Sequence, residues 1–169
     1  KPLLPGPFYT YYDGEGVART NKKIVNHGVL LTHFYNRETA KKAGRESTGN
    51  GTVAGGKIGT ASTNVIVKPS KKTTNELIAK IKDGVFVTDI TGLGQGLNPN
   101  SGDFSCQAQG FRIEDGKIST PLDLITLAGN ILQMMKDVVG FDDQYEFMAS
   151  GIGCSNALIK TMSIGGSKE

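Results

Sequence analysis

Residues 98–118 read NPNSGDFSCQAQGFRIEDGKI, and this stretch decides the fold class. Near its end the Asp115-Gly116 pair is flanked by apolar residues, which is the strongest short-range signal for a β-hairpin turn. A two-residue turn at this pair places Ile113 opposite Ile118. It also places Glu114 opposite Lys117, so both cross-strand pairs favour the same register. The stretch therefore predicts two antiparallel strands joined by a tight turn.

The strand that enters this hairpin carries small side chains at its centre. Phe104, Cys106 and Ala108 share one face of it, and glutamines occupy the other face. Beyond Gly110 the apolar residues fall on the glutamine face instead. A change of face at a glycine is typical of a β-bulge or a sharp twist.

The loop before this strand allows two interpretations. Ser101, Asp103 and Ser105 have side chains that cap loops by accepting hydrogen bonds from neighbouring amides, which would make the junction ordinary turn chemistry. Alternatively, the slim strand and the glycine-rich loop beside it leave room for another backbone, so an extended peptide could lie alongside. For the second interpretation the candidate peptide-binding residues are Asn98, Ser101, Gly102, Asp103, Phe104 and Ser105.

Three short helices are expected. Asn36 is a typical N-cap for the first, and Gly44 is a typical stop. Thr73 begins a capping box, and the helix that follows it should end by Gly84. The third helix is expected over about 128–139, with its apolar residues turned inward.

The rest of the chain alternates strands and glycine-rich loops. His27-Gly28 fits a two-residue hairpin turn, and residues 84–90 and 157–164 read as strands. Residues 49–59 contain five glycines and no apolar periodicity, so a long loop is expected there. The predicted fold class is α+β, with a predominantly antiparallel β-sheet, a few short helices and Gly-rich loops.

Length and charge limit the possible functions. The chain has 169 residues and a net charge of +3, which predicts one domain over residues 1–169. The basic residues are spread along the sequence, so no nucleic-acid-binding surface is indicated. No apolar run is long enough to cross a membrane and no signal-peptide pattern is present, so we expect a cytoplasmic protein with no membrane partner. Cys106 and Cys154 lack the spacing of a zinc knuckle or a disulfide scaffold.

The segment GVFVTDITGLGQGLNPNSGDFSCQAQGFRIEDGKISTPLDLITLAGNIL closely resembles the C-terminal region of the TldD/PmbA family, also called modulators of DNA gyrase. It contains, in order, that family's strand, Gly-rich loop, Asn-Pro-x-Ser-Gly-Asp-Phe-Ser segment, Gly-Phe, Asp-Gly hairpin and Thr-x-Ala-Gly-Asn helix start. The likeness extends to YDGEGVARTNKKIVNHGVLL, KKAGRESTGNG and LIKTMSIGG, and so covers nearly the whole chain. We therefore expect the C-terminal domain of a longer TldD/PmbA-like protein whose N-terminal part is absent.

The resemblance implies a role in proteolysis. In this family TldD-like and PmbA-like (TldE-like) subunits form a cytoplasmic complex that cleaves unfolded peptides. The TldD-like subunit binds zinc through a His-Glu-x-x-x-His helix and a cysteine, and such a metal would polarise the scissile carbonyl and activate a water. The expected partners are a TldD-like or PmbA-like subunit, in a hetero- or homodimer, and an unfolded peptide.

The chain departs from this zinc pattern. It contains no His-Glu-x-x-x-His, and its histidines, His27 and His33, lie across the predicted turn rather than on one helix face. No cofactor is expected in this chain itself, and zinc would belong to the intact protein or to its partner subunit. Cys154 stands where TldD-like members place their zinc-binding cysteine, and a buried, inert thiol is the other interpretation of this residue.

The residues around Cys154 and the Gly-Asp-Phe-Ser block look more like PmbA-like members. We therefore expect a subunit without its own metal, inactive by itself, that helps to bind extended peptides. Two alternatives stay open. The intact protein could itself be a zinc peptidase with Cys154 as a ligand, or the domain could be a scaffold that only docks the catalytic partner.

Overall fold

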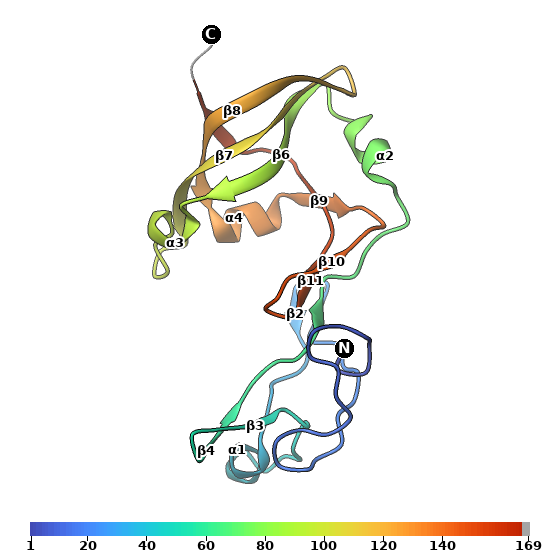
Figure 1. The fold of residues 1–169 in the computed structure, drawn as a ribbon, viewed down its shortest axis with the longest axis vertical. Helices are drawn as coiled ribbons and strands as arrows, with labels where there is room; N and C mark the ends of the chain where they lie inside the picture. The colour runs from blue at the N-terminus through green and yellow to red at the C-terminus, as the bar shows by residue number, and fades with distance from the viewer. Residues whose placement is uncertain (167–169) are drawn as a thin grey trace. The chain divides into compact units, whose positions relative to one another are not determined.

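The computed structural model describes residues 1–166 (Figure 1). Contacts within the chain group it into two compact units. Unit 1 consists of Lys1–Lys68 and Glu146–Cys154, and unit 2 consists of Pro69–Tyr145 and the segment from Ser155 on. The single domain expected from the sequence stays a prediction, and each unit is described by itself. Antiparallel strands dominate both units, so the predicted α+β class is confirmed.

Unit 2 is built on one sheet in the order β13-β8-β7-β6 (Figure 1). Its strands are β6 (Asp83–Thr91), β7 (Asp103–Glu114), β8 (Lys117–Asn130) and β13 (Ser163–Gly165). All the neighbours are antiparallel, and the long β7–β8 hairpin forms the centre of the sheet.

The hairpin turn lies where the sequence predicts it. Asp115 and Gly116 have φ angles of 46° and 77°, the left-handed values that a two-residue primed turn requires. Ile113 is opposite Ile118, as predicted. The register of β7 with β8 shifts between Ala108 and Gly110, so the predicted irregularity at this glycine is confirmed.

The core of unit 2 lies on one face of this sheet. Cys106 and Ala108 of β7 pack with Ile125 and Leu127 of β8, and all four are buried. This is the face that the alternation along β7 predicts. The other face carries the exposed glutamines, and beyond the bulge Ile113 becomes the buried residue, as the predicted change of face requires.

The remaining elements of unit 2 are short. They are α2 (Thr74–Ile78), α3 (Leu93–Gly96), α4 (Ile131–Lys136), β9 (Val138–Phe141) and β12 (Ala157–Ile159), with β9 paired to β12. Thr73 and Glu76 form the predicted capping box on α2. Within residues 1–166, none of the helices has the length and apolar character needed to cross a membrane.

The prediction for α4 is wrong in two respects. The helix begins at Ile131, because β8 continues to Asn130 and its pairing with β7 overrides the helical pattern of the preceding residues. Its apolar residues are not all turned inward, since Ile131 and Met134 are half-buried but Leu132 and Met135 are 62% and 67% exposed.

Unit 1 contains two small hairpins, a helix and a mixed three-stranded sheet. The elements are β1 (Val25–Asn26), β2 (Val29–Leu30), α1 (Arg37–Lys42), β3 (Gly51–Ala54), β4 (Lys57–Thr60), β5 (Val65–Ile66), β10 (Glu146–Phe147) and β11 (Ile152–Cys154). The long loop expected over 49–59 is wrong, because β3 and β4 form a hairpin there. Its turn is Gly55-Gly56, with φ angles of 56° and 74° that glycine adopts without strain.

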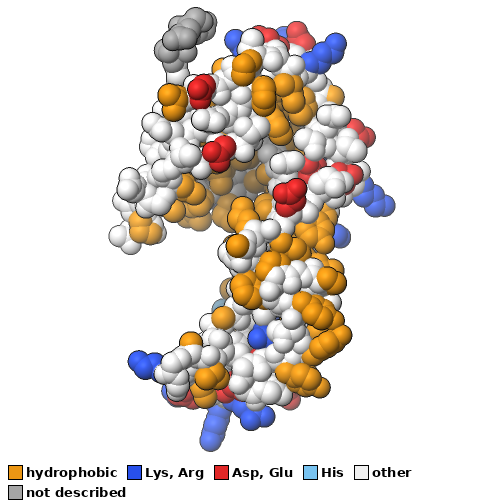
Figure 2. All heavy atoms as spheres, viewed as in Figure 1, with side chains coloured by type: hydrophobic (Ala, Val, Ile, Leu, Met, Phe, Trp, Pro, Cys, Tyr) orange, Lys and Arg blue, Asp and Glu red, His pale blue; other side chains and the backbone are white. Residues whose placement is uncertain are grey.

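Polar side chains hold unit 1 together. Asp13 is buried, and its carboxylate accepts hydrogen bonds from the backbone N–H groups of Glu15, Val17 and Gly51 at 2.7–2.9 Å. Burial alone would raise the pKa of Asp13, but these backbone hydrogen bonds hold it below its ordinary value. Large apolar side chains such as Tyr11 and Val29 remain exposed on this unit, and Figure 2 shows apolar side chains on the molecular surface.

Candidate functional site

The candidate site lies where the chain passes from β6 to β7. After β6 the backbone turns at Gly92, whose φ is 77°, and forms the single turn of α3. The chain then runs back along the start of β7, where Leu97 forms an isolated antiparallel bridge with Phe104. Asn98 closes the loop, because its N–H donates to the carbonyl oxygen of Asp103 at 2.8 Å.

Side-chain hydrogen bonds stabilise this loop, as the sequence predicts, but Asp103 does not have the capping role expected for it. The Oδ1 atom of Asn98 accepts hydrogen bonds from the N–H groups of Asn100 and Ser101, at 3.0 Å and 3.3 Å. Ser101 Oγ accepts from the N–H of Asp103 at 3.3 Å. The carboxylate of Asp103, expected to cap the loop, instead accepts from Asn130 Nδ2 at 2.8 Å across the β7–β8 pair.

A close backbone approach joins α3 to β7. A Cβ atom built on Gly96 would collide with the carbonyl oxygen of Ser105. Only glycine fits at this position, because any side chain would push the loop away from the strand. The sequence showed an unusual density of glycines here, but it did not show which strand this glycine approaches.

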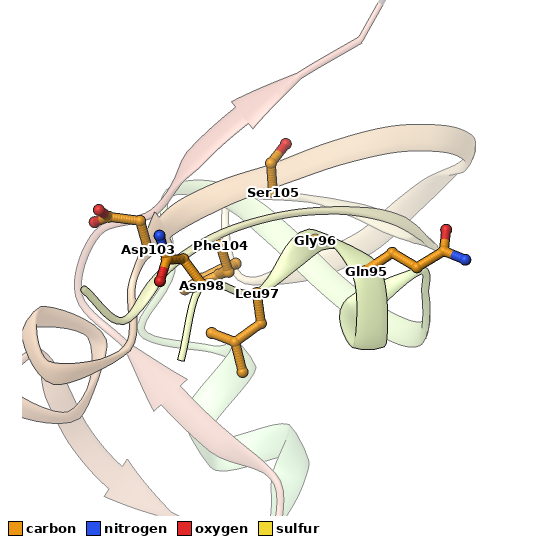
Figure 3. A pocket seen from close by; sticks show the side chains of 7 residues that line it. All are labelled: Gln95, Gly96, Leu97, Asn98, Asp103, Phe104 and Ser105. Atoms are coloured by element: carbon orange, nitrogen blue, oxygen red, sulfur yellow. The ribbon is translucent and has the colours of Figure 1, made fainter. Parts of the chain in front are cut away.

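An open hollow with a volume of about 490 Å³ lies between the loop and the strand. The residues that line it are Gln95, Gly96, Leu97, Asn98, Asp103, Phe104 and Ser105 (Figure 3). In Figure 3, Ser105 and Leu97 point to opposite sides, and Gln95 extends away from both. The hollow is thus bordered by backbone, amide, hydroxyl and apolar groups.

Four of the six predicted site residues line this hollow, namely Asn98, Asp103, Phe104 and Ser105. Ser101 and Gly102 shape the loop beside it without lining it. Sequence reasoning missed Gln95, Gly96 and Leu97, whose only signal was the glycine-rich segment before the turn.

Asp103 gives the hollow its charge. Of the seven residues that line it, all within the described chain, only Asp103 has an ionisable side chain. The hydrogen bond from Asn130, followed by that from Ser101, holds the pKa of this carboxyl below its ordinary value. The Asp103 side chain is therefore a carboxylate at neutral pH.

Within residues 1–166, the side chains present do not form a zinc site by themselves. Cys154 is half-buried at the end of β11 and pairs across the strand with Glu146, while His27 and His33 are exposed. Nowhere in residues 1–166 do three His, Cys, Asp or Glu side chains come together as a metal ion would require. No catalytic step can therefore be assigned to a metal held by these residues alone.

Comparison with known proteins identifies the family. A sequence profile of the PmbA/TldA metallopeptidase C-terminal domain matches residues 1–166. The chain belongs to the PmbA/TldD family. It is 35% identical over 158 residues to the metalloprotease PmbA homolog of Haemophilus influenzae, and 32% identical over 164 residues to the metalloprotease PmbA of Escherichia coli O157:H7.

These alignments cover 93% and 97% of the chain, but 33% and 34% of the two relatives. The chain thus spans about a third of the length of the curated PmbA proteins that it matches, and it corresponds to their C-terminal domain.

Solved structures of the family have the same fold. A modulator of DNA gyrase from Thermotoga maritima superposes with a TM-score of 0.85 at 31% identity, covering 98% of this chain and 38% of that one. TldE from Thermococcus kodakarensis superposes with a TM-score of 0.78 at 25% identity, covering 94% and 36%. The family resemblance deduced from the sequence is therefore confirmed.

Proposed function

We propose that this PmbA/TldD-family domain binds extended, unfolded peptides for a cytoplasmic peptidase complex whose metal is held outside this chain. The observation that carries the proposal is the hollow at the start of β7, with a volume of about 490 Å³ and the backbone of Gly96 pressed against the strand. Both backbone edges of β7 are already paired here, with β8 on one side and with Leu97 and Asn98 on the other, so an extended peptide would bind through the side chains that line the hollow.

The groups that line the hollow match the chemistry of a peptide. Gln95 carries a carboxamide, which donates and accepts hydrogen bonds as a peptide group does, and Asn98 adds a carboxamide NH₂ whose oxygen already accepts from the loop. Leu97 and Phe104 add apolar contact area. Such a combination favours the main chain of a peptide over any particular side chain, as expected for a subunit that handles unfolded chains.

The subunit role is proposed from the residues and the relatives together. The residues around Cys154 and the Gly-Asp-Phe-Ser block resemble those of PmbA-like members. The relatives include proteins named PmbA and TldE. We assign the chain to the PmbA-like subunit, with a TldD-like subunit as its partner and as the chain that binds zinc.

The test fills the hollow without disturbing the core. Ser105 is exposed on β7, and Trp is favoured in strands, so Ser105→Trp should fold normally while occupying the site. Ala108, by contrast, is 2% exposed in the core, so enlarging it would damage the sheet and would not test the site. Ser119→Trp makes the same change at an exposed position of β8 near the hairpin turn.

Binding of a fluorescently labelled, unstructured peptide to the intact protein is then measured by anisotropy. We expect Ser105→Trp to weaken binding at least about tenfold, since it removes the contact surface of the site. Ser119→Trp should bind as the natural protein does. Equal binding by both variants would place the peptide elsewhere and leave the domain as a docking scaffold.

A further inference from the structure

Asn130 lies at the junction of three parts of unit 2. It is the last residue of β8, its cross-strand partner on β7 is Asp103, and it is also the N-cap of α4. It does not line the hollow, and the sequence analysis placed it only at the helix start of the family motif Thr-x-Ala-Gly-Asn.

The two ends of its carboxamide perform different tasks. Oδ1 accepts hydrogen bonds from the N–H groups of Leu132 and Gln133, at 3.0 Å and 3.4 Å, and so caps α4. Nδ2 donates to the carbonyl oxygen of Ser101 at 2.9 Å and to Asp103 Oδ1 at 2.8 Å. One side chain thus fastens the site loop to both β8 and α4.

The main chain strengthens this connection. The N–H of Ile131 donates to the carbonyl oxygen of Gly102 at 2.8 Å, and the N–H of Gly102 donates to the carbonyl oxygen of Asn98. Gly102 itself has a φ of 79°, so the loop keeps a left-handed turn at the point where it meets Asn130. These bonds add to those that the loop forms with β7 itself, from Leu97 to Phe104 and from Asn98 to Asp103.

We propose that Asn130 is the positioning residue of the peptide site: through Ser101 and Asp103 it holds the 98–103 loop in the conformation that lines the hollow. This inference rests on the proposed peptide-binding function. A helix cap alone would need only the Oδ1 atom, and aspartate supplies that atom equally well. The Nδ2 donor is what distinguishes a positioning role from a capping role.

The experiment separates these roles with Asn130→Asp. This variant keeps the acceptor for α4, removes the donor to the loop, and places a second carboxylate against Asp103. The double variant Asn130→Asp with Asp103→Asn exchanges donor and acceptor and so restores the bond between the two side chains. Gln133→Glu is the matched control, because Gln133 Nε2 also donates to an exposed carboxylate, that of Asp137 at 3.0 Å, away from the hollow.

Two readouts are taken on the intact protein. Hydrogen exchange of the Gly102 and Ile131 amides reports loop order without any ligand, and anisotropy with an unstructured peptide reports binding. We expect Asn130→Asp to speed exchange at both amides and to weaken binding at least about tenfold, because it removes both Nδ2 hydrogen bonds to the loop. The double variant should slow exchange again in part, because it restores the bond between residues 130 and 103 but not the bond to Ser101, and Gln133→Glu should change neither readout.

Each outcome decides the question. Unchanged exchange in Asn130→Asp would reduce Asn130 to a helix cap and overturn the inference. A double variant whose exchange is as fast as that of Asn130→Asp would overturn the part of the inference that assigns positioning to the bond with Asp103. Faster exchange with unaltered peptide binding, or no binding by the natural protein, would refute the proposed function while leaving the positioning of the loop supported.

Discussion

Asp142 offers a sharp test of how unit 2 is held together. This residue follows β9 directly and is completely buried. Its Oδ2 atom accepts hydrogen bonds from Thr74 Oγ1 at 2.6 Å and from Asn156 Nδ2 at 2.8 Å, and its Oδ1 atom accepts from the N–H of Asn156 at 3.2 Å. One carboxylate therefore joins segments that are far apart in the sequence.

The substitution Asp142→Asn keeps the shape and removes the charge. One oxygen becomes an NH₂ group that faces at least one hydrogen-bond donor, and the Thr74 hydroxyl can rotate to accept from it. Loss of one hydrogen bond to a charged group costs about 1.5–3 kcal/mol, and a donor left unsatisfied adds to this. We expect unfolding free energy to fall by about 2–4 kcal/mol, which for a urea m-value of about 2 kcal/mol/M lowers the midpoint by about 1–2 M.

The assay is urea unfolding followed by far-UV circular dichroism, because the chain contains no Trp. Asp143→Asn is the control, since Asp143 only accepts an exposed hydrogen bond from the Gln144 side chain. That variant should stay within about 0.5 kcal/mol of the natural chain. Equal midpoints for the two variants would refute the assignment of Asp142 as an organiser of this unit.

Acid gives a second readout of the same residue. Burial alone would raise the pKa of Asp142, but hydrogen bonds from Thr74 and Asn156 hold it below its ordinary value. Its unfolded-state pKa is about 3.9, so its contribution is fully present above about pH 5 and is lost as pH falls through the lower, folded-state pKa. The stability difference between the natural chain and Asp142→Asn should therefore be larger at neutral pH than in strong acid, and a constant difference would contradict this.

Two further substitutions test the sheet and the metal assignment. Gly110→Ala should lower unfolding free energy by about 2 kcal/mol or more, because its Cβ would collide with the carbonyl oxygen of Phe86, while Gly94→Ala, which meets open space, should leave the urea midpoint nearly unchanged. Cys154→Ser in the intact protein should leave the zinc content, measured by mass spectrometry of the metal, as it is; loss of zinc would instead make Cys154 a ligand and the protein a zinc peptidase in its own right.

The sequence determined the local elements of this protein, because their causes are local. The Asp115-Gly116 turn, the capping box at Thr73 and the alternation along β7 each depend on residues a few positions apart, and all three are confirmed. The ordered motifs likewise identified the family correctly.

Other features depended on contacts that no local pattern contains. Residues 49–59 were expected as a loop, but hairpin pairing between β3 and β4 compensates for the poor strand propensity of their glycines. The start of α4 was misplaced because β8, held by its pairing with β7, extends through residues whose pattern favoured a helix.

The site shows the same division. Hydrogen-bonding residues in the sequence pointed to the loop around Asn98 and Asp103, but tertiary contacts form the hollow, among them the approach of Gly96 to Ser105 and the bridge between Leu97 and Phe104. Hydrogen bonds between residues 27 positions apart follow from strand pairing and not from spacing along the chain. The sequence alone therefore determined which turns and caps form, and the tertiary structure decided which backbone lies against which and so where a ligand could bind.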